Sequence, residues 1–80
     1  MSLARYFVFS RNGEWIVTLD GVRIGRHGSR QPALLSAIVM ADLMGSMRYE
    51  ADVMVEDDGR LALAWTYGEN PVPTDMGRAA

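Results

Sequence analysis

Two short stretches of the chain share one layout and flank its longest apolar segment. Each has large residues at alternate positions, then a polar triplet that ends in glycine, then large residues at alternate positions again. The first stretch covers residues 7–17 and the second covers residues 53–63. Period-two alternation around a glycine-containing turn is typical of a β-hairpin, so two hairpins with a helix between them are predicted.

The predicted fold is a two-layer α+β domain of β-β-α-β-β order. A four-stranded antiparallel sheet, made of the two hairpins, carries one helix on one of its faces, and the strand order is left open. Eighty residues are enough for one domain, which is predicted over residues 1–70. Residues 71–80 have no apolar periodicity and are predicted to form a flexible C-terminal tail.

The register of each hairpin depends on the length of its turn. A two-residue turn over 12–13 would put Phe9 and Trp15 on opposite faces, whereas a three-residue turn over 11–13 pairs them. Because a one-residue slip would turn an apolar set toward water, three-residue turns are favoured in both hairpins, the second over 57–59. These registers direct the following residues toward the helix: Phe7, Phe9, Trp15, Val17, Leu19, Val53, Val55, Leu61, Leu63 and Trp65.

A Gly/Arg-rich segment, residues 21–28, separates the first hairpin from the helix and is interpreted as a connection that could extend the second strand or cover a sheet edge. Ser29 is a good N-cap residue, with Pro32 in the first turn, and Gly45 is predicted as a left-handed helix stop. One stripe of the helix, at spacings of three and four, is predicted to meet the sheet: Leu34, Ala37, Ile38, Ala41 and Gly45.

A second apolar stripe of the helix has no obvious place in this fold. Leu35, Val39 and Leu43 recur every four residues, and Met40 lies beside them. The C-terminal tail, the 21–28 connection or a membrane surface could cover the stripe, but the helix lacks the basic polar face of a membrane-surface helix. A second copy of the chain is the favoured cover, so a homodimer with a short two-fold helix contact is predicted, and no membrane partner is expected.

Charge is distributed unevenly along the chain, although the net charge is only −2. Residues 1–40 hold five Arg and two acidic residues, whereas residues 41–80 hold three Arg and eight acidic residues. The absence of cysteine excludes disulfides and thiolate metal sites. The first residues lack the pattern of a secretory signal, so a cytoplasmic location is expected.

A candidate anion-binding patch precedes the helix and consists of Arg23, Arg26, His27, Ser29 and Arg30. Free N–H groups at a helix start, together with guanidinium groups, favour an anion such as a phosphate or a nucleic-acid backbone. The spacing fits neither a Walker loop nor a dinucleotide fingerprint. A simple linker, or docking onto the acidic half of a second copy, are the alternatives. Nucleic-acid binding is also disfavoured because the large aromatic residues are expected beneath the helix and the second hairpin is acidic.

No catalytic, cofactor or metal site is predicted. His27 is the single histidine and has no nucleophile or carboxylate that the sequence places beside it. The acidic turn over 56–59 lacks the alternating oxygen ligands of a calcium loop. We therefore expect a small binding or interaction module rather than an enzyme, with accessory nucleic-acid binding as the alternative.

A set of turn and core positions recurs in a recognisable pattern along the chain: Trp15, Val17, Gly21, Arg23, His27, Ser29, Ala37, Ala41, Val53, Val55, 58–60 and 66–71. In this pattern the chain resembles a family of short bacterial domains of unknown function with β-β-α-β-β order. The resemblance spans residues 7–71 and implies the fold, but no activity. The outer helix face departs from the family pattern, since Leu35, Val39 and Leu43 stand where the family tends to place Glu, Lys and Arg.

Overall fold

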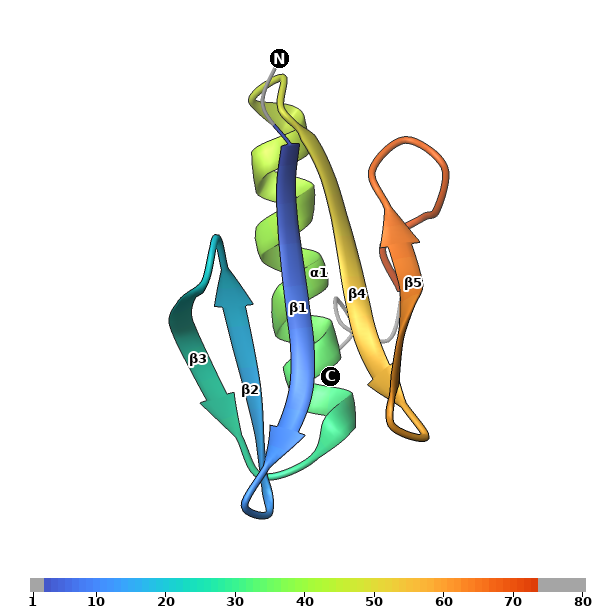
Figure 1. The fold of residues 1–80 in the computed structure, drawn as a ribbon. Coiled ribbons are helices and arrows are strands. Elements are labelled where there is room, and N and C mark those ends of the chain that lie inside the picture. Colours follow the sequence, from blue (N-terminus) through green and yellow to red (C-terminus); the bar gives the residue numbers. More distant parts are fainter. Residues whose placement is uncertain (1–2, 74–80) are drawn as a thin grey trace, which may run out of the picture.

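The computed structural model describes residues 3–73, which form a five-stranded sheet with one helix on one side (Figure 1). The elements in chain order are β1 (Leu3–Arg11), β2 (Glu14–Leu19), β3 (Val22–His27), α1 (Arg30–Ser46), β4 (Glu50–Asp57) and β5 (Arg60–Thr66). Across the sheet the order is β3-β2-β1-β4-β5, and α1 runs behind the strands in the view of Figure 1. The predicted α+β class, with a helix between two groups of strands, is confirmed.

The prediction of four antiparallel strands is wrong in two respects. The Gly/Arg-rich segment, interpreted as a connection, forms β3, which pairs antiparallel with β2 at one edge of the sheet. In addition, β1 and β4 pair in parallel at the centre, so the sheet is mixed. Parallel neighbours need a long crossover, and the path through α1 supplies it.

Each of the three hairpins turns through two residues, and the three turns share one backbone conformation. Both turn residues have positive φ: 53° and 80° at Asn12-Gly13, 54° and 80° at Asp20-Gly21, and 55° and 81° at Asp58-Gly59. Asn and Asp tolerate this left-handed region, glycine adopts it freely, and turns of this kind match the twist of antiparallel strands. The second of these turns creates β3.

The two-residue turns overturn the predicted three-residue turns and change which side chains face the helix. Phe9 lies opposite Ile16 rather than Trp15. Since successive side chains of a strand point to opposite faces, this register turns Phe7 and Phe9 away from the helix. The same correction applies to Leu61 and Leu63, which lie opposite β4 residues of that outward face.

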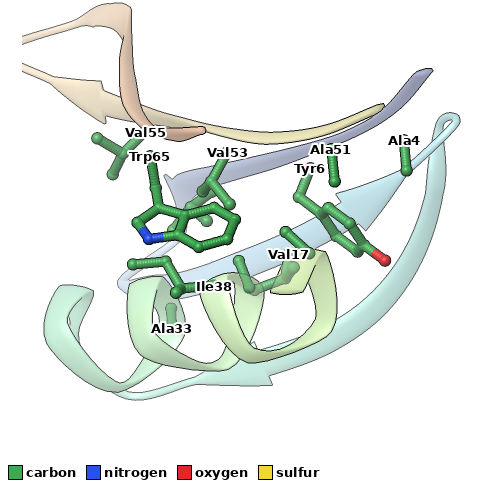
Figure 2. Packing of buried hydrophobic residues seen from close by; sticks show 12 residues of the cluster. Ala4, Tyr6, Val17, Ala33, Ile38, Ala51, Val53, Val55 and Trp65 are labelled. Atoms are coloured by element: carbon green, nitrogen blue, oxygen red, sulfur yellow. The ribbon is translucent and has the colours of Figure 1, made fainter. Parts of the chain in front are cut away.

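The core lies between α1 and the remaining face of the sheet. The strands contribute large side chains, and Figure 2 shows Tyr6, Val17, Val53 and Trp65 directed from the sheet toward the helix. Most of the buried helix residues are alanine or glycine, and these small residues let the helix backbone approach the strands closely. Its buried residues are Ala33, Ala37, Ile38, Ala41 and Gly45, while Leu34 is half-buried against the core, so the predicted sheet-facing stripe is confirmed with a shift at its start.

The ends of the helix follow the sequence only in part. Ser29 occupies the N-cap position with extended backbone, as predicted, but its side chain makes no capping hydrogen bond. Gly45 does not stop the helix: it is helical and buried, and a Cβ there would overlap the ring of Tyr67. The left-handed residue that ends the helix is Arg48, with φ 77°, whose N–H bonds to the Gly45 carbonyl.

The segment after β5 returns to the core. The Trp65 Nε1–H donates to the carbonyl of Pro71 at 3.0 Å, and Val72 packs against the core cluster. The predicted tail over 71–80 therefore begins with residues that contact the domain. Its remainder, residues 74–80, lies outside the described residues.

Candidate binding surface on the open face of the sheet

The face of the sheet away from α1, here called the open face, is not covered by any described element (Figure 1). The strand registers place one row of residues across all five strands at the same level. In order from β3 to β5, the row is Arg23, Thr18, Phe7, Met54 and Leu63. A neighbouring row joins Arg26, Ile16 and Phe9 on one side and Glu56 and Leu61 on the other.

Apolar side chains occupy the middle and one flank of the open face. Ile16 is only 5% exposed, yet it does not belong to the core cluster beneath the helix. Its burial is a property of the open face, where Phe9 is its direct cross-strand neighbour. Phe7 and Phe9 are half-buried, whereas Leu61 and Leu63 on β5 are 50% and 57% exposed. A mixed sheet that buries only one face usually carries polar residues on the other, so this surface is unusual.

A shallow groove of about 920 Å³ crosses the open face. Phe7, Phe9 and Ile16 lie in its lining, together with Leu61 from β5. Arg23 and Glu56 are also among the lining residues, on opposite sides of β1. The groove therefore combines an aromatic and aliphatic floor with opposite charges on its two sides.

The basic groups of the open face lie on β1 and β3. The Arg11 guanidinium carbon lies 5.6 Å from the centre of the Phe9 ring, within the range of a cation–π contact. On β3, Arg23 is exposed, and Arg26 makes only a long ion pair of 3.8 Å with Glu14 of β2. Exposed contacts such as Arg11 with Phe9 and Arg26 with Glu14 add little to the free energy of folding. A partner molecule can therefore displace them and bind the guanidinium groups.

The acidic groups of the open face lie mainly on β4. Two of them, Asp52 and Glu56, accept hydrogen bonds from residues of β1. Asp52 is 7% exposed and accepts two hydrogen bonds of 2.9 Å from Nε and Nη2 of Arg5. The hydrogen bond to Asp52 and its negative charge raise the pKa of the Arg5 guanidinium. Glu56 Oε1 accepts from the Ser10 N–H at 2.8 Å and from the Ser10 hydroxyl at 3.3 Å.

The predicted helix stripe is present and partly exposed. Val39 is 47% exposed and Leu43 is 60% exposed, while Leu35 is half-buried. Met40, predicted to join this surface, packs against the core instead. The stripe therefore offers two strongly exposed apolar side chains, as many as β5 offers on the open face, but it has no counterpart of the half-buried aromatic pair Phe7 and Phe9.

The predicted anion-binding patch is not a single surface. Arg23 and Arg26 point to the open face, because they lie opposite Thr18 and Ile16. His27 lies opposite Trp15 and therefore points to the helix side of the sheet. Ser29 and Arg30 lie at the start of α1. The segment is a strand rather than a loop, and the alternation of its side chains separates these groups.

Within residues 3–73, no group of three or more His, Asp or Glu side chains is arranged to hold a metal ion. In the same part of the chain, no helix has both the length and the apolar character needed to cross a membrane. The titratable groups of the open face are ion-paired, hydrogen-bonded or exposed.

Sequence reasoning missed the open-face residues Phe7, Phe9, Leu61 and Leu63, all of which were expected in the core. The signal that could have found them is the identity of the turns. Asn-Gly and Asp-Gly are the strongest sequence signs of a two-residue hairpin turn, and that turn fixes the register.

Comparisons with known proteins give no match: no family model, no curated protein and no solved structure is significantly similar to this chain.

Proposed function

We propose that this protein is a small non-catalytic interaction module that forms a homodimer through the open face of its sheet. The observation that carries the proposal is the apolar surface, left uncovered by residues 3–73, in which Phe7, Phe9 and Ile16 adjoin Leu61 and Leu63. Contiguous exposed apolar surface of this kind marks a contact with another molecule. The contact is assigned to the sheet rather than to the predicted helix stripe, because the sheet offers more apolar side chains and a groove.

The size of the open face fits this role. The molecule measures 35 × 34 Å along its long axes and 20 Å through its thickness, so its broad faces are the largest surfaces it can offer. A face of these dimensions has room for the roughly 800 Å² per partner that a stable protein contact buries. A second copy laid on this face would cover both aromatic side chains and both exposed leucines of β5.

Two matched pairs of variants test the proposal. Leu61→Glu with Leu63→Glu places two charges on the open face, and Val39→Glu with Leu43→Glu places two charges on the helix stripe. The wild-type exposures of the two pairs are similar, 50% and 57% against 47% and 60%, so the variants differ mainly in location. In analytical ultracentrifugation, the wild type should be a dimer at high concentration, the open-face variant a monomer and the helix variant a dimer.

The opposite pattern would assign the contact to the helix stripe. A wild-type chain that stays monomeric up to millimolar concentration would contradict dimerisation through either surface. Circular dichroism of each variant confirms that the fold is retained.

Nucleic-acid binding is a second candidate, favoured by one observation. Phe7 and Phe9 stand two residues apart on the central strand of an open face, near Arg11 and Arg23, and exposed aromatic rings on a sheet can stack on bases. The acidic groups of β4 oppose it, because they repel phosphates. Binding of a fluorescent single-stranded oligonucleotide should then weaken steeply with salt and be lost in Arg11→Ala with Arg23→Ala. No binding at low salt excludes this function.

A further inference from the structure

The open face carries opposite charges on its two sides, separated by β1. The charges of β1 itself are Arg5, which is paired with Asp52, and Arg11, which lies opposite Glu14 of β2. On the β3 side stand Arg23 and Arg26, of which Arg26 makes a long ion pair with Glu14 of β2. On the β4 side stand Glu50 and Glu56, with Asp52 already neutralised by Arg5. A surface with separated charges of opposite sign can complement itself, provided that the second copy is turned so that its halves are exchanged.

Only two symmetric arrangements bring two such faces together with their strands aligned. The two-fold axis must lie in the plane between the sheets, because each copy presents the same surface to the other. An axis across the strands would lay each strand over its own counterpart, so that Arg23 would face Arg23 and like charges would meet. An axis along β1 would instead reverse the row, so that β3 of one copy lies over β5 of the other.

We infer that two copies pack sheet to sheet about a two-fold axis parallel to β1 that passes close to Phe7, with the basic β3 side of each copy over the acidic β4–β5 side of the other. This inference rests on the proposed function. In this arrangement Phe7 meets Phe7 at the axis, Thr18 lies over Met54, and Arg23 lies over Leu63. The two Arg11 side chains also lie near the axis, where the Glu14 directly opposite each of them on β2 balances their charge. The arginine stems cover the exposed leucines of β5, while the guanidinium groups reach the acidic groups of neighbouring β4.

Nearly aligned strands are a common geometry for two packed sheets, with a separation of about 10 Å. Like charges brought together across a contact are costly, and opposite charges set the orientation in which partners dock. The charge pattern thus selects one of the two symmetric arrangements.

Site-directed cross-linking distinguishes the arrangements, and the chain suits it because it contains no cysteine. The full chain is prepared as Arg23→Cys and as Leu63→Cys, which lie at the two ends of one row and are both exposed. A bismaleimide about 10 Å long matches the separation of packed sheets. The inference predicts cross-linked dimers when the two variants are mixed, at a yield several-fold above that of either variant alone.

The outcomes separate this inference from the proposed function. Two results would overturn the orientation while dimerisation stands. In the first, each variant cross-links to itself as well as to the other variant. In the second, the wild type is a dimer in ultracentrifugation, but the mixture of the two variants gives no cross-linked product. If ultracentrifugation shows the wild type to be a monomer, the proposed function itself fails. Should either substitution weaken association, Arg26→Cys with Leu61→Cys, one row along the sheet, supplies a second pair with the same expectation.

Charge reversal provides an independent readout. Arg23→Glu with Arg26→Glu makes the open face predominantly acidic, and the dimer dissociation constant should rise by at least about tenfold at low salt. Adding Glu50→Arg and Glu56→Arg in the same chain restores separated charges and should recover most of the affinity. An unchanged dissociation constant in the first variant contradicts the inferred orientation.

Discussion

Both faces of β1 carry apolar residues, but the residues on the two faces are buried to different extents. On the helix side, Tyr6 and Val8 are 3% and 0% exposed because α1 packs over them with small side chains. On the open face, Phe7 and Phe9 remain half-buried because only their cross-strand neighbours shield them. The comparison teaches that strand composition does not decide burial. The position of α1 decides which apolar residues are buried, and the open face keeps an apolar surface that another molecule can contact.

The largest difference between the faces is expected from truncating a fully buried valine. Val53→Ala, on the helix side, should lower the free energy of unfolding by about 2–3 kcal/mol, through lost burial and an unfilled cavity. Leu63→Ala, 57% exposed on the open face, should change it by less than about 0.5 kcal/mol. Urea denaturation at micromolar concentration measures both, and equal losses would contradict the contrast.

A methyl group at Gly45 tests how closely the helix side is packed. Gly45→Ala should destabilise the fold by about 1–3 kcal/mol, because the new Cβ would overlap the Tyr67 ring. Gly28→Ala is the matched control, since a Cβ at that position meets no atom within 4 Å. Its effect should stay within about 0.5 kcal/mol in thermal or urea denaturation. A neutral Gly45→Ala would mean that the helix has room to move away from Tyr67.

Ile16 should show an intermediate effect, because it is buried on the open face without the cover of the helix. Ile16→Val is expected to cost about 0.5–1.5 kcal/mol. The conservative control is Ile24→Val, since Ile24 is 41% exposed. If the open face is covered in a dimer, the cost of Ile16→Val should increase with protein concentration, and a constant cost would weaken the proposed contact.

The smallest effect on stability is expected from the ionisation of the Tyr6 hydroxyl, which occurs only at high pH. Burial raises the pKa of the Tyr6 hydroxyl above its usual value of 10.0, and the negative charge of Asp20 adds to the shift. The folded state therefore holds this proton more tightly than the unfolded state. Stability should be fully present below pH 10 and fall as the pH rises toward the folded pKa.

Urea midpoints measured from pH 8 to pH 11 test this expectation. Tyr6→Phe should reduce the alkaline slope of these midpoints, because it removes the group whose pKa is raised by folding. The same slope in the wild type and in Tyr6→Phe would show that other groups cause the alkaline loss.

The sequence allowed the fold class and the helix to be predicted because their patterns are unambiguous. The small residues Ala37, Ala41 and Gly45 recur at helical spacing and all are buried against the sheet. The strand β3 was missed because Gly25 and two arginines interrupt its apolar residues, and β3 carries no clean alternation. The Asp20-Gly21 turn that precedes it was the available sign.

The candidate site could not be predicted, because Tyr6, Phe7, Val8 and Phe9 form one continuous apolar run. When both faces of a strand are apolar, hydrophobic alternation cannot choose between registers that differ by one residue. The geometry of the Asn12-Gly13 turn makes that choice. Aromatic residues expected in the core thereby became the surface residues on which the proposed function depends.

The parallel pairing of β1 with β4 has a consequence for the order in which the sheet folds. The three antiparallel pairings join neighbouring segments through two-residue turns, so each can form after closing a very short loop. The central pairing instead joins segments separated by two strands and the whole helix. Since distant pairings form slowly, we expect the two halves of the sheet to assemble early and the middle of the molecule to join last.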